Sequence, residues 1–351
     1  MTSRIPVTVL GATGVVGQRF VARLARHPLF ELAHLAASER SSGRRYREAC
    51  AWRIAGSEPF AGLGERVLAA CDPAAAAGRI VFSALDADVA RELEPEFARA
   101  GALVFSNASA WRMEPDVPLL VPEVNPGHLE LARLQRERRG WKGAIVCNPN
   151  CTTAVLALAL APLHEAFGVQ AVSMASLQAV SGAGYPGVAS LDILANAIPF
   201  IRGEEEKVEA EANKLLGSLA GETVRPAGIP VSAACHRVPV LDGHLLAVSV
   251  RLAGEPGPEA VREALEGWRG EPQRLGLPSA PPRPILVHER EDRPQPRLDV
   301  DALGGMPVHV GRVRPCPVLG VRFSALGHNL ERGAAGGSVL NAELAHARGL
   351  L

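Results

Sequence analysis

The sequence predicts an α/β protein in two parts: a parallel sheet covered by helices, followed by an α+β part with a mixed, largely antiparallel sheet. Three observations carry this prediction. Short apolar strands alternate with helical segments over the first 150 residues, a glycine-rich turn follows the first strand, and longer alternating strands occur beyond residue 151. Short apolar strands separated by helices are typical of a parallel sheet with both faces covered.

The elements of the first part follow from apolar periodicity. The expected strands are residues 5–10, 32–37, 79–83, 102–105 and 143–147. The expected helices are residues 15–26, which end at His27-Pro28 because proline disfavours a helical residue before it, and residues 88–100.

The second part changes pattern after residue 151. The expected helices are 153–167, a charged helix that starts at 201–207, and 258–269, which has proline in its first turn where no N–H is needed. The expected strands are 169–180, 245–252 and 285–287, the last after a proline-rich connection at 272–284. A final helix, about 334–348, should return to the first domain. The expected division is therefore 1–150 completed by 329–351, and 151–328.

Composition narrows the class of protein. The 351 residues are 47% hydrophobic and 21% charged, which is ordinary for a globular chain of about two domains. The 37 basic and 37 acidic residues argue against nucleic-acid or membrane partners. No 18-residue apolar stretch, signal-peptide pattern or C-x-x-C pair occurs, so we expect free thiols in a reducing cytoplasm and no metal site.

The turn after the first strand has the form G-x-x-G-x-x-G, at residues 11–17. Glycine allows the backbone to approach a pyrophosphate that rests on a helix N-terminus, so the turn predicts a Rossmann-like dinucleotide-binding domain. The alternative is a plain tight turn. The residues expected to contact the cofactor are Gly11, Thr13, Gly14, Val15 and Val16 here, and Ser83 at a later strand end.

The residues after the second strand bear on the choice of cofactor. Ser38, Arg40 and Ser41 offer hydroxyl and guanidinium groups suited to a 2′-phosphate, which favours NADP(H). Glu39 leaves the alternative open, because an acidic residue near this position is typical of NAD sites.

Cys151 is the candidate nucleophile. It lies in the sequence NPNCTT, between an apolar strand and an apolar helix. A thiol at a helix N-terminus faces unpaired backbone N–H groups and the positive end of the helix dipole, which stabilise the thiolate. The alternative is a buried cysteine that only fills space.

The second domain offers partners for this thiol. Arg237 could bind a substrate carboxylate in a bidentate manner, and His244 could act as acid or base. Gln178 precedes the glycine-rich loop 181–187, where the backbone can approach a ligand. Lys207 stands out because the chain has only three lysines, so a compact ammonium can be specifically required there, for example against a phosphate.

Six segments together resemble the aspartate-β-semialdehyde dehydrogenase family, in its archaeal and fungal-type branch. They are GATGVVGQ (11–18), NPNCTT (148–153), QAVSGAGYPG (178–187), IRGEEEK (201–207), RVPVLDGH (237–244) and HNLERGAAGGSVLNAE (328–343). They span nearly the whole chain in order, so the resemblance is far more specific than the glycine turn alone.

The resemblance implies a role for each matching residue. Cys151 would form the acyl-enzyme, His244 would be its acid/base partner, and Gln178 would orient the acyl group. Substrate would be bound by Arg237 at its carboxylate, by Glu205 at its amine, and by Lys207, Arg112 and Asn107 at its phosphate. Ser181, Gly182 and Asn341 would lie near the nicotinamide. The amine contact could instead belong to Glu204 or Glu206.

The implied reaction is the NADPH-dependent conversion of L-aspartyl-4-phosphate to L-aspartate 4-semialdehyde, through a thioester at Cys151, in lysine, threonine and methionine biosynthesis. In reverse, His244 would remove the hemithioacetal proton. Family resemblance suggests a homodimer or homotetramer formed through the second domain. One alternative is another acyl-phosphate reductase, such as N-acetyl-glutamyl-phosphate reductase, which would not need Glu205. Another is a non-catalytic NADP-binding regulatory protein.

Overall fold

The computed structural model describes residues 4–56, 58–75 and 80–351. The chain forms two compact units. The first unit contains Met1–Leu120, Gly127–Asn148 and Ala334–Leu351, and the second contains Val121–Pro126 and Pro149–Gly333. Within the described residues, no helix is long and apolar enough to cross a membrane.

The first unit is built on a six-stranded sheet in the order β3-β2-β1-β4-β5-β6, and every pair is parallel. Its strands are β1 (Ile5–Leu10), β2 (Phe30–Ala37), β3 (Ala69–Ala70), β4 (Ile80–Ser83), β5 (Leu103–Ser106) and β6 (Ala144–Cys147). Its helices are α1 (Val15–Leu24), α2 (Tyr46–Ala49), α3 (Ala87–Ala100), α4 (Leu131–Arg139) and α11 (Gly336–Ala347). All residues of β4, β5 and β6 are buried, so both faces of the sheet are covered, as expected for short apolar strands.

The predicted elements of this unit exist, with ends that shift by one or two residues. The first helix stops at Leu24 rather than residue 26, and the second strand begins at Phe30 rather than residue 32. Arg79, expected to begin the fourth strand, lies outside the described residues. β3 was not predicted, because two alanines carry no periodic signal.

The C-terminal helix α11 does pack in the first unit. It contacts α1, β4 and β5. Glu343 on α11 is fully buried, and its carboxylate lies 2.8 Å from Nε2 of His27, just after α1. The Nδ1 atom of the same ring accepts hydrogen bonds from the backbone N–H groups of Leu29 and Phe30. The pair therefore ties the last helix to the turn between α1 and β2.

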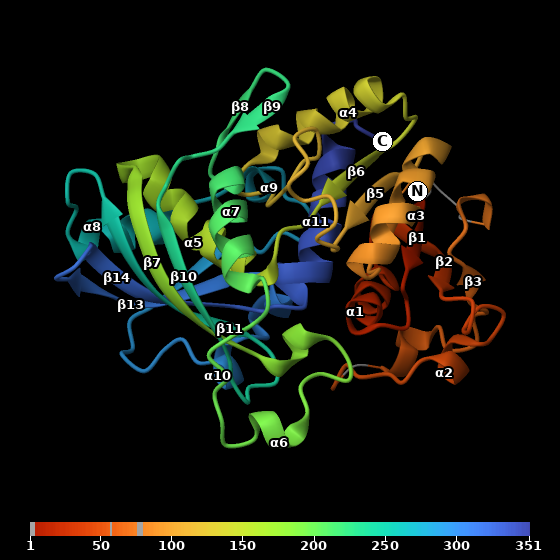
Figure 1. Cartoon of the computed structure of the whole chain (residues 1–351), viewed down its shortest axis with the longest axis horizontal. Coiled ribbons are helices and arrows are strands. Elements are labelled where there is room, and N and C mark those ends of the chain that lie inside the picture. The colour runs from red at the N-terminus through yellow and green to blue at the C-terminus, as the bar shows by residue number, and fades with distance from the viewer. Residues whose placement is uncertain (1–3, 57, 76–79) are drawn as a thin grey trace. The chain divides into compact units, whose positions relative to one another are not determined.

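The second unit is built on a mixed sheet in the order β10-β7-β11-β14-β13-β12. Figure 1 labels five of its strands, β7, β10, β11, β13 and β14. The strands are β7 (Val169–Gln178), β10 (Val231–Arg237), β11 (His244–Leu252), β12 (Ile285–His288), β13 (Val308–Cys316) and β14 (Gly320–Gly327). The outer pairs β10–β7 and β12–β13 are parallel, and the three inner pairs are antiparallel. A separate small hairpin joins β8 (Ser218–Ala220) and β9 (Thr223–Arg225).

Helices cover one face of this sheet. They are α5 (Cys151–Phe167), α7 (Glu204–Leu215) and α8 (Pro258–Gly267), with short helices α6 (Ser190–Ile193), α9 (Glu271–Arg274) and α10 (Pro296–Asp299) in the connections. Residues 152–163 of α5 are all buried, which explains why that segment is apolar all round. Along β11 buried residues alternate with more exposed ones, so the opposite face of the sheet is open in the single chain.

The unit boundaries differ from the expected division in two places. Residues 329–333 belong to the second unit rather than to the C-terminal part of the first, and so does the excursion Val121–Pro126. One contact explains both differences, because Arg332 forms a buried bidentate ion pair with Glu123. Such a long-range pair leaves no local pattern in the sequence.

Candidate active site

Cys151 is the first residue of α5, and the residue before it caps the helix. The Asn150 side-chain oxygen accepts hydrogen bonds from the N–H groups of Thr152 and Thr153, at 2.9 and 3.1 Å. The expectation that unpaired N–H groups face the thiol is therefore wrong for these two, because asparagine is a favoured N-cap and occupies them. The orientation of the helix dipole toward Cys151 remains.

His244 is the direct partner of Cys151. Its Nε2 atom lies 3.2 Å from Sγ, and its Nδ1 atom accepts a hydrogen bond from the backbone N–H of Ala179 at 3.2 Å. A nitrogen that accepts from a backbone N–H carries no proton, so we assign the neutral ring its proton at Nε2. That Nε2–H points at sulfur, which suits a thiolate as acceptor.

The surroundings of His244 also disfavour a charged ring. The side chain has no exposed surface. Burial, and then the nearby charge of Arg237, lower the pKa of His244 to about 3, although a contact with the Gly243 carbonyl acts in the opposite direction. The imidazole is therefore neutral at physiological pH.

Arg237, the last residue of β10, brings a positive charge beside this pair. The side chain is only 6% exposed, and one Nη donates to the Ala179 carbonyl at 2.8 Å. Burial lowers the pKa of Arg237, and Cys151 and Glu204 raise it by their negative charge. Within the described ranges the guanidinium forms no ion pair, so it is suited to an anionic ligand.

The glycine-rich loop passes close to both residues. A Cβ atom added at Gly182 would lie 2.9 Å from Nη1 of Arg237 and 3.1 Å from Cε1 of His244. Any larger residue there would displace the two side chains. The loop, Arg237 and His244 all belong to the second unit, so this contact lies within one unit.

Gln178 ends β7, next to β10. Its amide donates to the Ser176 hydroxyl at 3.1 Å, and the side chain is buried. It also lies near Cys235, a second thiol of the unit. Burial raises the pKa of Cys235 to about 11, so this thiol stays protonated and is a poor nucleophile, in contrast to the environment of Cys151.

The three glutamates at the start of α7 have different surroundings. Glu204 is buried and accepts hydrogen bonds from Asn150 and Thr152, so it braces the cap of α5. Glu205 is half-buried and accepts from the backbone N–H of Cys235, whereas Glu206 is exposed. Lys207 is half-buried one residue further on. Glu204 is therefore committed to structure, which leaves Glu205 better placed to meet a ligand.

The glycine turn of the first unit has the three separate constraints typical of a dinucleotide site. Gly11 has a φ of +72°, and Gly17 permits contact between helix and turn, because a Cβ there would lie 2.0 Å from the Gly11 carbonyl oxygen. Gly14 precedes α1 and is exposed, and no side chain of the described residues forms a cap hydrogen bond at that helix. The helix N-terminus therefore remains open to an anion.

Two other predicted cofactor sites lie at the carboxyl edge of the same sheet. Ser38 and Arg40 are exposed in the turn after β2, and Ser41 is half-buried there. Ser83 ends β4 opposite Leu10 of β1, but it has no exposed surface. It lies beside Glu94, whose pKa burial raises to about 7 while the Ser106 and Ser83 hydroxyls lower it. Contact between the Ser83 side chain and a cofactor stays a prediction.

The first unit also holds Asn107 and Arg112. One Nη of Arg112 donates to the Asn107 carbonyl at 2.7 Å, and the Asn107 side-chain oxygen accepts from the Ser338 hydroxyl of α11. Asn341 is fully buried on α11, and its Oδ1 has no hydrogen-bond partner in the described part of the chain. Convergence of Asn107 and Arg112 with Lys207 of the second unit stays a prediction.

Several residues that shape this site were missed from the sequence. They are Asn150 and Glu211 around the cap of α5, and Asn329 and Gly333 before α11. Only Asn150 carried a local signal, since asparagine two positions before a threonine at a helix start is a common N-cap. The others act through contacts between distant segments.

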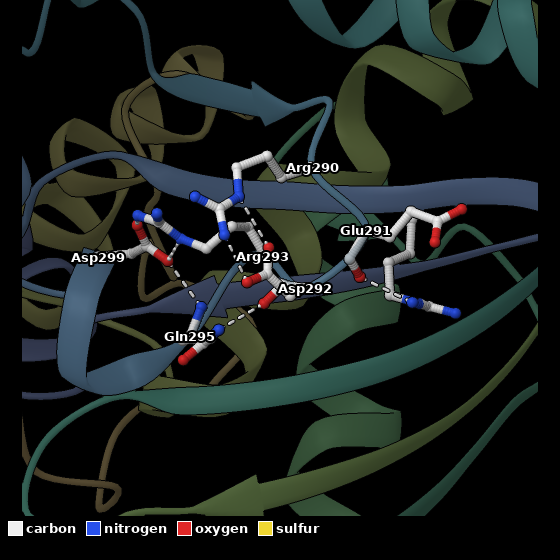
Figure 2. Close-up of polar contacts among 7 residues, drawn as sticks. Arg290, Glu291, Asp292, Arg293, Gln295 and Asp299 are labelled. Carbon is white, nitrogen blue, oxygen red and sulfur yellow. Dashed lines mark hydrogen bonds and ion pairs between the residues drawn. The ribbon is translucent and has the colours of Figure 1, made fainter.

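A second cluster in this unit involves His288, His309 and Asp299, whose polar atoms lie within 4.8 Å of one another. Figure 2 shows why Asp299 is not a free ligand: its carboxylate pairs with Arg293 and accepts from the Gln295 backbone N–H. Burial, His288 and Arg293 lower the pKa of His309 to about 4. We therefore assign this cluster a structural role, in which it holds the connection between β12 and β13.

Comparison with known proteins places the chain in a family. The model described as "Semialdehyde dehydrogenase, NAD binding domain" matches residues 6–132, and "Semialdehyde dehydrogenase, dimerisation domain" matches residues 160–332. The aspartate-semialdehyde dehydrogenase of Archaeoglobus fulgidus is 53% identical over 341 residues, which cover 97% of this chain and 98% of the relative. The chain belongs to the aspartate-semialdehyde dehydrogenase family.

Solved structures of family members agree. Aspartate semialdehyde dehydrogenase with NADP from Candida albicans matches with a TM-score of 0.91 at 41% identity, over 99% of this chain and 100% of that one. Aspartate semialdehyde dehydrogenase II complexed with ASA from Vibrio cholerae matches with a TM-score of 0.76 at 26% identity, over 99% of each chain. The predicted family, enzyme class and fold class are confirmed.

Proposed function

We propose that this chain catalyses the NADPH-dependent reductive dephosphorylation of L-aspartyl-4-phosphate to L-aspartate 4-semialdehyde, in lysine, threonine and methionine biosynthesis. The observation that carries the proposal is the contact between Cys151 Sγ and His244 Nε2 at 3.2 Å, beside a buried arginine that has no ion-pair partner among the described residues. Family membership supports the choice of substrate.

The first unit fits a dinucleotide. The uncapped N-terminus of α1 would hold the pyrophosphate through Gly11, Thr13, Gly14, Val15 and Val16, and Ser38, Arg40 and Ser41 would hold the 2′-phosphate. The open Oδ1 of Asn341 suits an amide donor such as the nicotinamide carboxamide. NADPH, when bound, supplies the hydride that reduces the thioester. Glu39 lies in the same exposed turn as Ser38, where an acidic side chain suits the ribose hydroxyl of NAD.

The chain's own residues carry the covalent steps. The Cys151 thiolate attacks the acyl carbon, and the tetrahedral oxyanion collapses to a thioester as phosphate leaves with a proton from solvent. After reduction, the hemithioacetal oxyanion collapses to the aldehyde and returns the thiolate. Neither collapse needs a proton from His244. Its Nε2–H therefore serves as a neutral hydrogen-bond donor to the oxyanion, in place of the proton-removing base expected from sequence.

Substrate groups would be held by residues with complementary charge. Arg237 would bind the carboxylate, Glu205 the amine, and Lys207 with Arg112 and Asn107 the phosphate. Gln178 would orient the acyl group from the end of β7. Two observations support these roles: the guanidinium of Arg237 is desolvated beside Cys151, and Glu205 remains half-exposed while Glu204 is used internally.

Phosphate-dependent oxidation of aspartate semialdehyde tests the proposal. We expect NADP reduction that requires phosphate, a weaker rate with NAD, and little rate with N-acetyl-glutamate semialdehyde, since the blocked amine cannot pair with Glu205. Preference for the N-acetylated substrate would favour the other acyl-phosphate reductase. Cofactor binding without turnover of either aldehyde would favour a regulatory protein.

We also propose a homodimer or homotetramer formed through the open face of the second unit's sheet. The register aligns Ala234, Ala175, Ala247 and Ser324 across four neighbouring strands, and Ser232, Ser173 and Ser249 in the next row. Rows of small side chains leave a flat face that a second copy could approach closely. The matching family model for this region is described as a dimerisation domain. No nucleic-acid or membrane partner is proposed.

Substituting arginine for Ala247, at the centre of this face, should shift the protein toward monomer, because a buried unpaired charge costs several kcal/mol. Analytical ultracentrifugation over a range of concentrations measures the change. The Arg269→Ala variant, which removes a half-buried charge beyond α8, serves as the control and should keep the wild-type mass. An unchanged mass for Ala247→Arg would exclude this face.

We place the enzyme in a reducing cytoplasm, which its six free cysteines support.

A further inference from the structure

The turn His328–Gly333 contacts the surroundings of both reacting side chains. On the His244 side, Asn329 is 1% exposed, and its Oδ1 accepts from the backbone N–H of Gly243 at 2.8 Å. Its Nδ2 donates to the Ser181 hydroxyl, also at 2.8 Å. One amide thus joins the residue before His244 to the loop that lies against the imidazole.

On the Cys151 side, Gly333 packs directly on the nucleophile. A Cβ atom added at Gly333 would lie 2.6 Å from Cβ and 2.9 Å from Cα of Cys151. The turn is closed by a hydrogen bond from the Gly333 N–H to the His328 carbonyl at 3.0 Å, and a π-helical turn begins at Glu331. π-Helical turns occur frequently at functional sites.

A buried ion pair fixes this turn in place. Arg332, 1% exposed, binds both oxygens of Glu123 at 2.9 and 3.0 Å, and its Nε donates to the Met306 carbonyl. Glu123 has no exposed side-chain surface and also accepts from Gln273. Arg332 lies between Asn329 and Gly333 in the chain. The ion pair therefore anchors the turn between the residue that bonds Gly243 and the residue that packs on Cys151.

We infer that the turn His328–Gly333 sets the position of His244 against Cys151, with Asn329 as a positioning residue for the imidazole and Gly333 for the thiol. Asn329 touches neither substrate nor the reacting atoms. It acts through Gly243 and Ser181, and through Ser181 on Gly182, which lies against the ring, since a Cβ atom added there would be 3.1 Å from Cε1 of His244. The inference rests on the proposed roles of Cys151 and His244.

The test compares Asn329→Ala with a matched control, Asn213→Ala. Asn213 is also an amide that bonds backbone groups of the second unit, since it joins α7 to Ile229, and its side-chain hydrogen bonds among the described residues go to Glu209 and Ile229. In Asn329→Ala we expect kcat to fall about 10²-fold, because small misplacement of reacting groups has effects of that size. The fall in kcat should be larger than any change in KM for NADP, because Ser181 and Gly182 are also expected near the nicotinamide, and Asn213→Ala should keep wild-type kcat.

Alkylation of Cys151 by iodoacetamide supplies a readout that needs no substrate. In Asn329→Ala the pH profile of alkylation should move to higher pH, because the misaligned Nε2–H stabilises the thiolate less. Asn329→Asp, which keeps the acceptor for Gly243, should lie between. A wild-type alkylation profile and kcat in Asn329→Ala would overturn the inference. The inference would also be overturned if kcat fell in both Asn329→Ala and Asn213→Ala in proportion to the fall in their melting temperatures. If the wild-type enzyme failed to oxidise aspartate semialdehyde, the alkylation profiles would still decide the positioning role.

Discussion

Replacing Cys151 with alanine should abolish turnover, by about 10⁴-fold or more, while leaving NADPH binding intact. Sulfur is the only atom that can form the proposed thioester, and the residues proposed to hold the pyrophosphate and the 2′-phosphate of the cofactor belong to the other unit. Cys151→Ser should be almost as inactive, since a hydroxyl has a far higher pKa than a thiol and the neutral His244 is a poor base to activate it. The measurements are phosphate-dependent NADP reduction and NADPH titration by fluorescence.

Cys316→Ala is the matched control. That thiol lies at the β13–β14 hairpin, where backbone N–H groups lower its pKa, but its side chain is buried, so it tests whether alkylation is selective for Cys151. The control variant should keep full activity, and peptide mapping after brief alkylation of the wild-type enzyme should find label on Cys151. Substantial turnover in Cys151→Ala, or loss of activity only on labelling Cys316, would contradict the covalent mechanism.

The fold class could be predicted from the sequence because the signals that carry it are local. Apolar runs predicted the buried strands of the parallel sheet, alternation predicted β7 and β11, and the glycine turn predicted the junction of β1 and α1. Strand and helix ends moved by one or two residues because the ends depend on hydrogen bonds with neighbouring segments. Three strands of the second sheet were not predicted: β13, β14 and β10, which carries Arg237 and whose alternating small residues resemble a loop.

The site was only partly predictable, because its contacts join residues that are far apart in the sequence. Cys151 and His244 could be named, but their 3.2 Å contact joins residues 93 positions apart. The tautomer of His244 depends on a backbone N–H of Ala179, a group that every residue except proline possesses. Likewise, nothing local distinguishes Glu204 from Glu205; only the packing of α7 against α5 commits the former to the helix cap.

The protonation state of His244 should affect how the free energy of unfolding depends on pH. Its folded-state pKa of about 3 lies below the ordinary value of 6.5. Between these values the unfolded chain binds a proton that the folded protein excludes. The stabilisation is thus fully present above pH 6.5 and is lost by about 1.4 kcal/mol per pH unit as the pH falls toward 3. Urea unfolding at pH 5 and 7.5 should therefore show a steeper loss for wild type than for His244→Gln, in which the other histidines are unchanged.

The rate separates a neutral donor from a titrating base. His244→Ala should lower kcat about 10²–10³-fold, the usual effect of removing one donor from an oxyanion. His244→Gln should retain more activity, because its amide can donate a hydrogen bond although it cannot exchange a proton near neutral pH. Wild-type kcat/KM should accordingly show no ionisation near pH 6.5 from this residue. A rate-limiting pKa there that disappears in His244→Gln would instead establish proton transfer by the imidazole, and would require the ring to break its hydrogen bond with Ala179 during the cycle.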